Sequence, residues 1–228
     1  MQFLTKTDNE LNIQVSFGNR RIATAQSLKF LGLTIDTTLS WKHHIGELTS
    51  SLDRACYAIR SIKPFMSLNV LRNTYFSYAH TIISYGIIFW VNSSYSEDVF
   101  KIQKRIIRII MNWSRNASCQ QLFKDLNIFP IHSQYIYSIL LFVTKNKNQF
   151  LSNSQVHKIN TRQTFDLYVP TANLTVYQKG VYYSGIKIYS HLPTAIKDLS
   201  DDKNKFKLTL KRCLLPNSFY SLEEYFNT

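Results

Sequence analysis

The spacing of apolar residues changes near Ser40, and this change constrains the fold more than any other feature of the sequence. Before Ser40, apolar and polar residues alternate in segment 11–17, Gly18-Asn19 tolerates the positive φ of a tight hairpin turn, and a further strand is predicted over 28–35. After Ser40, apolar residues recur every three or four positions, which is typical of helices. The sequence therefore predicts an α+β fold that is mostly α: a short antiparallel β segment, then a helical bundle, then a helical and irregular C-terminal region.

The helical spacing also predicts where each helix lies and how the chain is divided. Residues 146–173 are rich in Asn, Gln and Ser and are expected to be irregular, with a strand at 165–169. Three domains are predicted: a β segment at 1–39, a helical domain at 40–115, and a C-terminal region at 116–228. The predicted helices are 45–62, 68–82, about 96–113, about 133–145, 194–199, 204–214 closed by Pro216, and one starting with the capping-box sequence Ser221-Leu222-Glu223-Glu224.

The charge balance indicates the kind of partner. The chain has 27 Lys and Arg against 14 Asp and Glu, a formal net charge of +13. Such a surplus favours phosphate-bearing partners, because each neutralised phosphate releases counterions. RNA or DNA bound without sequence preference is the leading prediction. A membrane surface and a merely basic domain without a polyanionic partner are the alternatives.

The cysteines and the apolar runs bear on the compartment. Cys56, Cys119 and Cys213 are odd in number and widely spaced, so neither a disulfide framework nor a Cys-based zinc site is expected. The longest apolar stretches, 82–91 and 139–143, are too short to span a bilayer. These patterns predict a reduced, intracellular protein without a membrane span.

The sequence offers no catalytic constellation. Asp201-Asp202 is the only adjacent pair of aspartates, and its place at a predicted helix start favours capping over Mg²⁺ binding. His43 and His44 are adjacent, and adjacent helical residues point about 100° apart, so solvated or phosphate-contacting histidines are expected rather than metal ligands. We therefore expect no metal, cofactor or catalytic residue in this chain.

The clearest candidate for binding is the helix predicted at about 96–113. Its cations fall within an arc of about 100°, with no acid among them, and its isoleucines and Trp113 occupy the other side. Phosphate contact is the leading interpretation, against a plain solvated face or a membrane-surface helix. A second, weaker row lies on the helix whose apolar face is Phe206, Leu210 and Leu214. The candidate nucleic-acid-binding residues are Lys101, Lys104, Arg105, Arg108 and Arg115 in the first row and Lys203, Lys207 and Lys211 in the second.

Several short motifs occur in an order that resembles a known family. They are FLGLTID at 30–36, LSWKHHI at 39–45, the run 75–86 ending in Ser84-Tyr85-Gly86, Phe89-Trp90, IQKRIIRII at 102–110, NTRQ at 160–163, YSGIK at 183–187, Leu192-Pro193 and FYSLEEY at 219–225. Taken together, they resemble the C-terminal part of reverse transcriptases from non-LTR (LINE-type, jockey-like) retrotransposons. Val91 and Ser190 depart from the pattern, at positions where Gly and Asn are common.

The resemblance carries expectations about function. It implies that residues 1–39 are the end of the polymerase palm and that residues 40–115 are a thumb. The family's catalytic aromatic-x-Asp-Asp hairpin and its third metal-binding aspartate would lie upstream of Met1, with the Mg²⁺ that the intact enzyme uses for RNA-directed DNA synthesis. The chain would then be a truncated fragment that positions template and primer in the nucleus or cytoplasm. Two alternatives stay open: a piece of an enzyme whose reading frame is broken, and a domesticated protein-interaction module that binds no nucleic acid.

Overall fold

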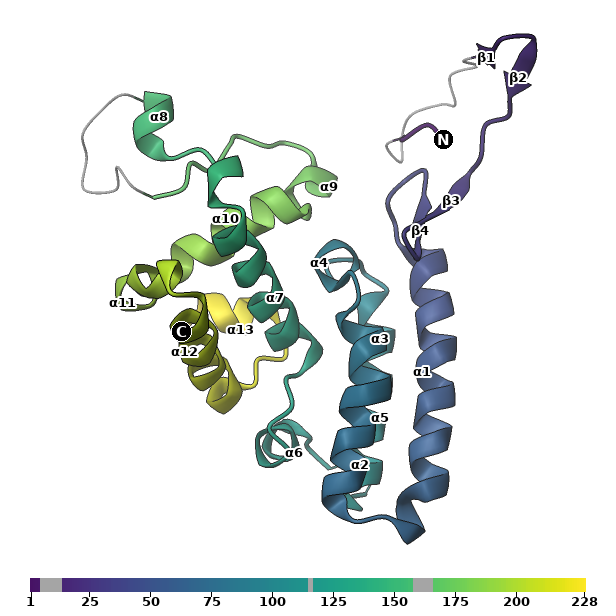
Figure 1. Cartoon of the computed structure of the whole chain (residues 1–228), viewed down its shortest axis with the longest axis vertical. Helices are drawn as coiled ribbons and strands as arrows, with labels where there is room; N and C mark the ends of the chain where they lie inside the picture. The colour runs from purple at the N-terminus through teal and green to yellow at the C-terminus, as the bar shows by residue number, and fades with distance from the viewer. Residues whose placement is uncertain (5–13, 115–116, 158–165) are drawn as a thin grey trace.

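In a computed structural model of the chain, the described residues are 1–4, 14–114, 117–157 and 166–228. Figure 1 shows two β-hairpins at the N-terminal end, a group of long helices that includes α1, and a C-terminal group of helices that includes α7 and α12. The predicted fold class is confirmed: the chain is α+β and mostly α, and its β structure is short, antiparallel and N-terminal.

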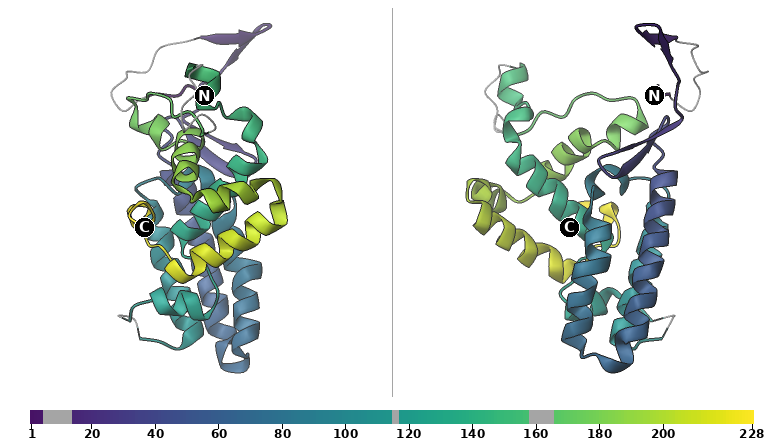
Figure 2. Two further views of the ribbon diagram at one scale, coloured as in Figure 1. Left: turned by 90° about the vertical axis from the view of Figure 1, so that its left-hand side faces the viewer. Right: turned by 45° about the vertical axis from the view of Figure 1, so that its right-hand side comes forward.

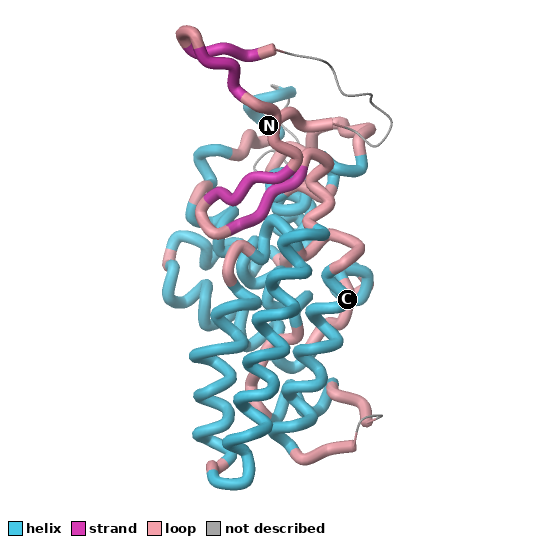
Figure 3. Tube along the Cα trace, turned by 90° about the vertical axis from the view of Figure 1, so that its right-hand side faces the viewer, coloured by secondary structure: helices cyan, strands magenta, loops and turns pink. Residues whose placement is uncertain are grey.

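The β structure consists of two separate two-stranded hairpins, which Figure 3 shows in magenta. The single strand predicted over 28–35 was wrong. Leu31 and Gly32 both adopt positive φ, 47° and 79°, and this pair forms the tight turn of a second hairpin. The strands are β1 (Val15–Phe17) paired with β2 (Arg20–Ile22), and β3 (Ser27–Phe30) paired with β4 (Leu33–Asp36).

Helix α1 (Lys42–Ile62) follows the second hairpin and confirms the first predicted helix. It ends where Pro64 stands in a short 3-10 turn, η1 (Lys63–Phe65). Its predicted apolar stripe is buried. The stripe residues that are buried are Ile45, Leu48, Leu52, Cys56 and Ile59.

Helix α1 and helix α5 (Ser96–Met111) lie against each other in the bundle (Figures 1 and 2). The predicted helix over 68–82 is interrupted in its middle by a π-helical turn. Tyr75 of this turn is buried, and its hydroxyl accepts a hydrogen bond from the Gln103 side-chain amide of α5. The elements between α1 and α5 are α2 (Leu68–Thr74), η2 (Tyr75–Ala79), α3 (His80–Ser84) and α4 (Ile87–Trp90).

The C-terminal region is a second group of helices packed around α7. Gly185 allows α10 to approach α7 closely, since a Cβ at this position would lie 2.8 Å from a Val143 methyl group. Pro216 lies inside the last turn of α12, so the predicted stop at Pro216 was slightly early. The helical elements are α6 (Gln120–Asp125), α7 (Ile131–Lys145), η3 (Lys147–Gln149), α8 (Asn153–His157), α9 (Thr175–Gln178), α10 (Val181–His191), α11 (Thr194–Lys197), η4 (Asp198–Asp201), α12 (Lys203–Asn217) and α13 (Leu222–Phe226).

The stretch predicted to be irregular is partly ordered. It contains η3 and α8, and the described part of the strand predicted at 165–169, residues 166–169, forms one bridge, between Ser152 and Leu167. One hydrophobic core cluster runs from Ile45 of α1 to Tyr225 of α13 and so crosses the predicted boundary at 115. The three predicted domains stay a prediction.

Candidate nucleic-acid interface

Helix α5 carries most of the first cationic row. Its apolar side is buried, including Ile102, Ile106 and Ile107. The helix ends two residues earlier than predicted, at Met111, because Asn112 adopts a left-handed conformation with φ 58°. The Trp113 amide donates to the Arg108 carbonyl at 3.0 Å and the Asn112 amide donates to the Ile109 carbonyl at 3.3 Å, which is the Schellman pattern.

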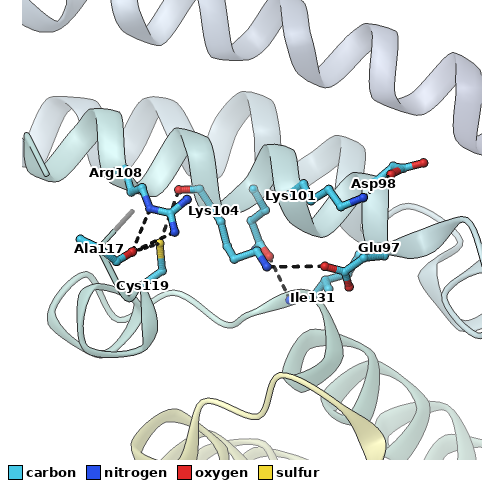
Figure 4. A network of polar contacts seen from close by, with 9 residues as sticks. Glu97, Asp98, Lys101, Lys104, Arg108, Ala117, Cys119 and Ile131 are labelled. Carbon is cyan, nitrogen blue, oxygen red and sulfur yellow. Dashed lines mark hydrogen bonds and ion pairs between the residues drawn. The ribbon is translucent and has the colours of Figure 1, made fainter. Parts of the chain in front are cut away.

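The two lysines of this row are paired with acids, so the expectation that no acid accompanies them was wrong. Lys101 Nζ lies 2.9 Å from Asp98 and Lys104 Nζ lies 3.5 Å from Glu97 (Figure 4). Both acids belong to the first turn of α5, where the helix dipole favours them. The hydrogen bond from Lys101 to Asp98 raises the pKa of this lysine. Lys104 Nζ also lies 4.1 Å from the centroid of the Phe100 ring.

The two arginines of the row are each held by a different partner. Arg105 Nη1 donates to Asp53 of α1 at 3.0 Å. Arg108 donates through Nε and Nη2 to the Ala117 carbonyl, at 3.0 and 2.8 Å (Figure 4). Each guanidinium is therefore fixed in position and keeps N–H donors that these bonds do not use. Arg115 lies outside the described residues.

Arg105 and Arg108 take part in a basic pocket at the adjoining C-terminal ends of α1 and α5. The pocket has a volume of about 250 Å³ and no acid among its lining residues. Lys63 Nζ donates to Asn112 Oδ1 across it at 2.6 Å. Arg60, in the last turn of α1, is exposed and forms no ion pair with any described residue. The lining residues, which we call the basic pocket, are Arg60, Lys63, Arg105, Arg108, Ile109, Asn112 and Trp113.

The helix ends account for some of this charge but not for all of it. A helix C-terminus carries about half a negative elementary charge, so it attracts cations. Two such ends offset roughly one positive charge, and the Asp53 carboxylate offsets that of Arg105. The basic pocket holds four cationic side chains, from α1, η1 and α5. A net positive potential is left, which suits an anion of the size of a phosphate.

The second cationic row lies on α12, away from the basic pocket. Figure 1 shows α12 and α1 on opposite sides of the molecule. The apolar face predicted for this helix is confirmed, because Phe206, Leu210 and Leu214 are buried. The lysines are exposed, and Lys211 Nζ lies 5.9 Å from the centroid of the Tyr137 ring. The structure therefore does not bring the two predicted rows together. The lysines of this row are Lys203, Lys207 and Lys211.

One member of each adjacent pair, His44 and Asp202, has a structural role. Prediction of a solvated His44 was wrong: its Nδ1 accepts the Thr34 amide at 3.4 Å, and burial lowers the pKa of the imidazole. His43 is exposed. Capping by Asp202 is confirmed, since its Oδ1 accepts the Asn204 and Lys205 amides, both at 3.1 Å. These bonds, led by that of Lys205, lower the pKa of Asp202.

Sequence reasoning missed Arg60, Lys63 and Trp113 as site residues. They come from the ends of two helices that lie more than forty residues apart in the chain, so no local pattern links them. Trp113 was assigned to the buried side of a continuous helix. The helix instead ends before it, and 56% of its surface is exposed. The signal that could have found it is Asn112, a residue that favours the left-handed conformation at helix ends.

Metal sites and membrane spans are two other kinds of feature to consider. The described residues contain no group of three or more His, Cys, Asp or Glu side chains arranged to hold a metal ion. Within the same part of the chain, no helix is long and apolar enough to cross a membrane. Comparison of the chain with protein-family models, with curated proteins and with solved structures found no match.

Proposed function

We propose that this chain corresponds to the end of the palm, the thumb and the C-terminal region of a non-LTR-type reverse transcriptase and that it holds nucleic acid for chemistry done by other residues. The ordered motifs of the sequence support the family. One structural observation supports the binding: four cationic side chains from three elements line one pocket without an acid among the lining residues. In such a role, the chain would position RNA or DNA through phosphate contacts and would have little sequence preference.

The proposal is tested by the salt dependence of binding to a labelled single-stranded RNA, followed by fluorescence anisotropy. Each phosphate neutralised on a single strand contributes about −0.7 to the slope of log K against log salt concentration. The four cations of the basic pocket set a limit of about −3 for this slope, reached if each of them also contacts a different phosphate along the strand, and one phosphate held among them gives about −0.7. The double substitution Arg60→Gln and Lys63→Gln should flatten this slope by about 0.7–1.4.

A matched control removes the same charge from the other row, by Lys203→Gln and Lys207→Gln on α12. Both lysines are exposed, so the fold should tolerate the change, which circular dichroism checks. The slope of this variant should stay near that of the unmodified chain. A flattened slope in the α12 variant alone would move the interface to α12. No binding at low salt would overturn the proposed function.

A protein-interaction module is the second candidate, and the β-hairpins favour it. Phe17 is 84% exposed, Leu31 is 74% exposed and Phe30 is 57% exposed. Exposed apolar side chains gathered on hairpins are typical of surfaces that bind another protein. A partner that is retained at high salt and after nuclease treatment would support this candidate over nucleic-acid binding.

A further inference from the structure

We propose that the basic pocket takes one nucleotide unit of a single strand, with the phosphate among its cations and an unpaired base stacked on the Trp113 indole. This inference rests on the proposed nucleic-acid binding and adds a preference for single strands over duplexes. It follows from the donors that remain in the pocket, from the conformation that exposes Trp113, and from the size of the pocket.

The cations of the pocket are held in place while keeping donors for a ligand. Lys63 uses one of its three N–H groups on Asn112. Arg108 uses Nε and one Nη2 hydrogen on the Ala117 carbonyl, so both Nη1 hydrogens stay unused by that contact. The Arg60 side chain is exposed and has no hydrogen bond or ion pair with any other described residue. Guanidinium groups keep their charge at all ordinary pH values and match the geometry of phosphate oxygens.

Trp113 supplies an aromatic surface beside these cations. The Schellman turn at Asn112 takes the chain out of the helix just before Trp113, so the indole does not join the core of α5. The side chain lines the pocket together with Ile109 and is 56% exposed. A large aromatic side chain exposed next to guanidinium groups is the combination that holds single-stranded nucleic acid by stacking and phosphate contact.

The pocket is selective because only an unpaired base can offer its face to the indole. In a duplex, each base is stacked between its neighbours, and extracting it requires a few kcal/mol. The pocket, at about 250 Å³, is slightly smaller than the usual range of about 300–1,000 Å³ for sites that enclose a ligand. It therefore fits a single nucleotide unit, and the rest of the strand would lie outside it.

The test measures the affinity of the chain for a single-stranded oligonucleotide and for a duplex of the same length, at one salt concentration. The single strand should bind about tenfold more tightly, the ratio that one stacked base supplies. Trp113→Leu should lower single-strand affinity by about tenfold and so remove this preference, whereas Trp113→Phe should keep part of it. Because Trp113 is exposed, both variants should fold, and circular dichroism checks this.

Indole fluorescence gives a second readout of the same contact. The other tryptophans are Trp90, which is fully buried, and Trp41, which precedes the first turn of α1, at the end of that helix opposite Arg60. The single strand should therefore quench the emission of the unmodified chain but not that of Trp113→Phe. Equal binding of both nucleic acids, with no effect of Trp113→Leu, would overturn the stacking pocket and leave the proposed function standing. Loss of binding to both nucleic acids in the unmodified chain would overturn the proposed function as well.

Discussion

Replacement of Asp36 by alanine should destabilise the chain more than any exposed aspartate does. The Asp36 carboxylate accepts five hydrogen bonds in the turn between β4 and α1. They come from the amide and hydroxyl of Thr38 at 3.1 and 2.8 Å, from the amide and hydroxyl of Ser40 at 2.8 and 3.1 Å, and from the Trp41 amide at 2.8 Å. This turn also contains Leu39 and Trp41 at positive φ, 52° and 63°, so the carboxylate holds a strained backbone.

The size of the effect follows from these bonds. A hydrogen bond to a charged group contributes about 1.5–3 kcal/mol, but five bonds to one carboxylate are not additive. We expect Asp36→Ala to lower the free energy of unfolding by about 2–4 kcal/mol. The matched control is Asp98→Ala, which removes an exposed ion pair with Lys101 and should change stability by less than about 1 kcal/mol. Urea unfolding followed by circular dichroism measures both variants, and a loss below about 0.5 kcal/mol for Asp36→Ala would refute the reasoning.

The same carboxylate should make stability depend on pH. Burial raises the pKa of Asp36, but the hydrogen bonds from Ser40, Thr38 and Trp41 outweigh it, and the pKa lies below its ordinary value of 3.8. A carboxyl group whose pKa is lower in the folded than in the unfolded state stabilises the fold. This contribution is complete at pH values above the unfolded-state pKa and is lost as the pH falls through the folded-state pKa. The stability difference between the unmodified chain and Asp36→Asn should therefore be constant near neutral pH and shrink below about pH 3.8. A difference that does not change with acidification would contradict this account.

Two further substitutions test the packing of the helices by the same urea assay. Gln103→Leu should lower the free energy of unfolding by about 2–4 kcal/mol, because it leaves the Ile131 amide and the Phe129 carbonyl without the partners that the buried Gln103 gives them at 3.0 and 2.9 Å. Gly185→Ala should lower the free energy of unfolding by about 1–3 kcal/mol, because the added methyl group would lie 2.8 Å from Val143 and push α10 away from α7. Gly46→Ala is the control: its added methyl group meets nothing within 4 Å, so it should not lower the stability.

The helices could be predicted from the sequence because each has one continuous apolar face. The stripe of α1 and the Phe206, Leu210 and Leu214 face of α12 are buried as predicted. The hairpin of β3 and β4 was missed although the apolar alternation changes phase between Phe30 and Leu33, where the turn lies. Gly32 was the available signal there, and its backbone at φ 79° is what reverses the chain.

The candidate site was predicted less well than the fold, because a helical pattern shows which residues share a face but not what lies opposite. Spacing alone placed Lys101 and Arg105 on one surface. The structure separates them: Lys101 bonds Asp98 on its own helix, whereas Arg105 bonds Asp53 of α1 and lines the basic pocket. The contribution of α1 and η1 to that pocket depends on tertiary packing, which periodicity cannot reveal.

Several of the motifs that carry the family resemblance, those at 30–36, 39–45, 84–86 and 89–90, meet at the junction of hairpin and bundle, whereas NTRQ at 160–163 lies outside the described residues. The Tyr85 hydroxyl donates to the Leu31 carbonyl, and a Cβ at Gly32 would lie 3.3 Å from the Tyr85 ring. The Tyr85 carbonyl in turn accepts the indole N–H of the buried Trp90 at 3.1 Å. His44 lies near Trp90, at 6.3 Å between ring centroids. These motif residues therefore stabilise the junction between the second hairpin and the helical bundle, whether or not they bind a partner.

The motif at 102–110 combines both roles in one helix. Its isoleucines at 102, 106, 107 and 110 are buried, and the Gln103 side chain bonds three residues, Tyr75, Phe129 and Ile131. Arg105 and Arg108 face the basic pocket. Substitutions of the first group should lower stability without a specific effect on the salt slope of binding. Substitution of Arg105 should lower that slope and leave the core intact, since its ion pair with Asp53 is exposed and contributes about 0–1 kcal/mol. If substitutions in this nine-residue motif divide into those that lower stability and those that lower the salt slope, the residues needed for folding are distinguished from the residues that bind.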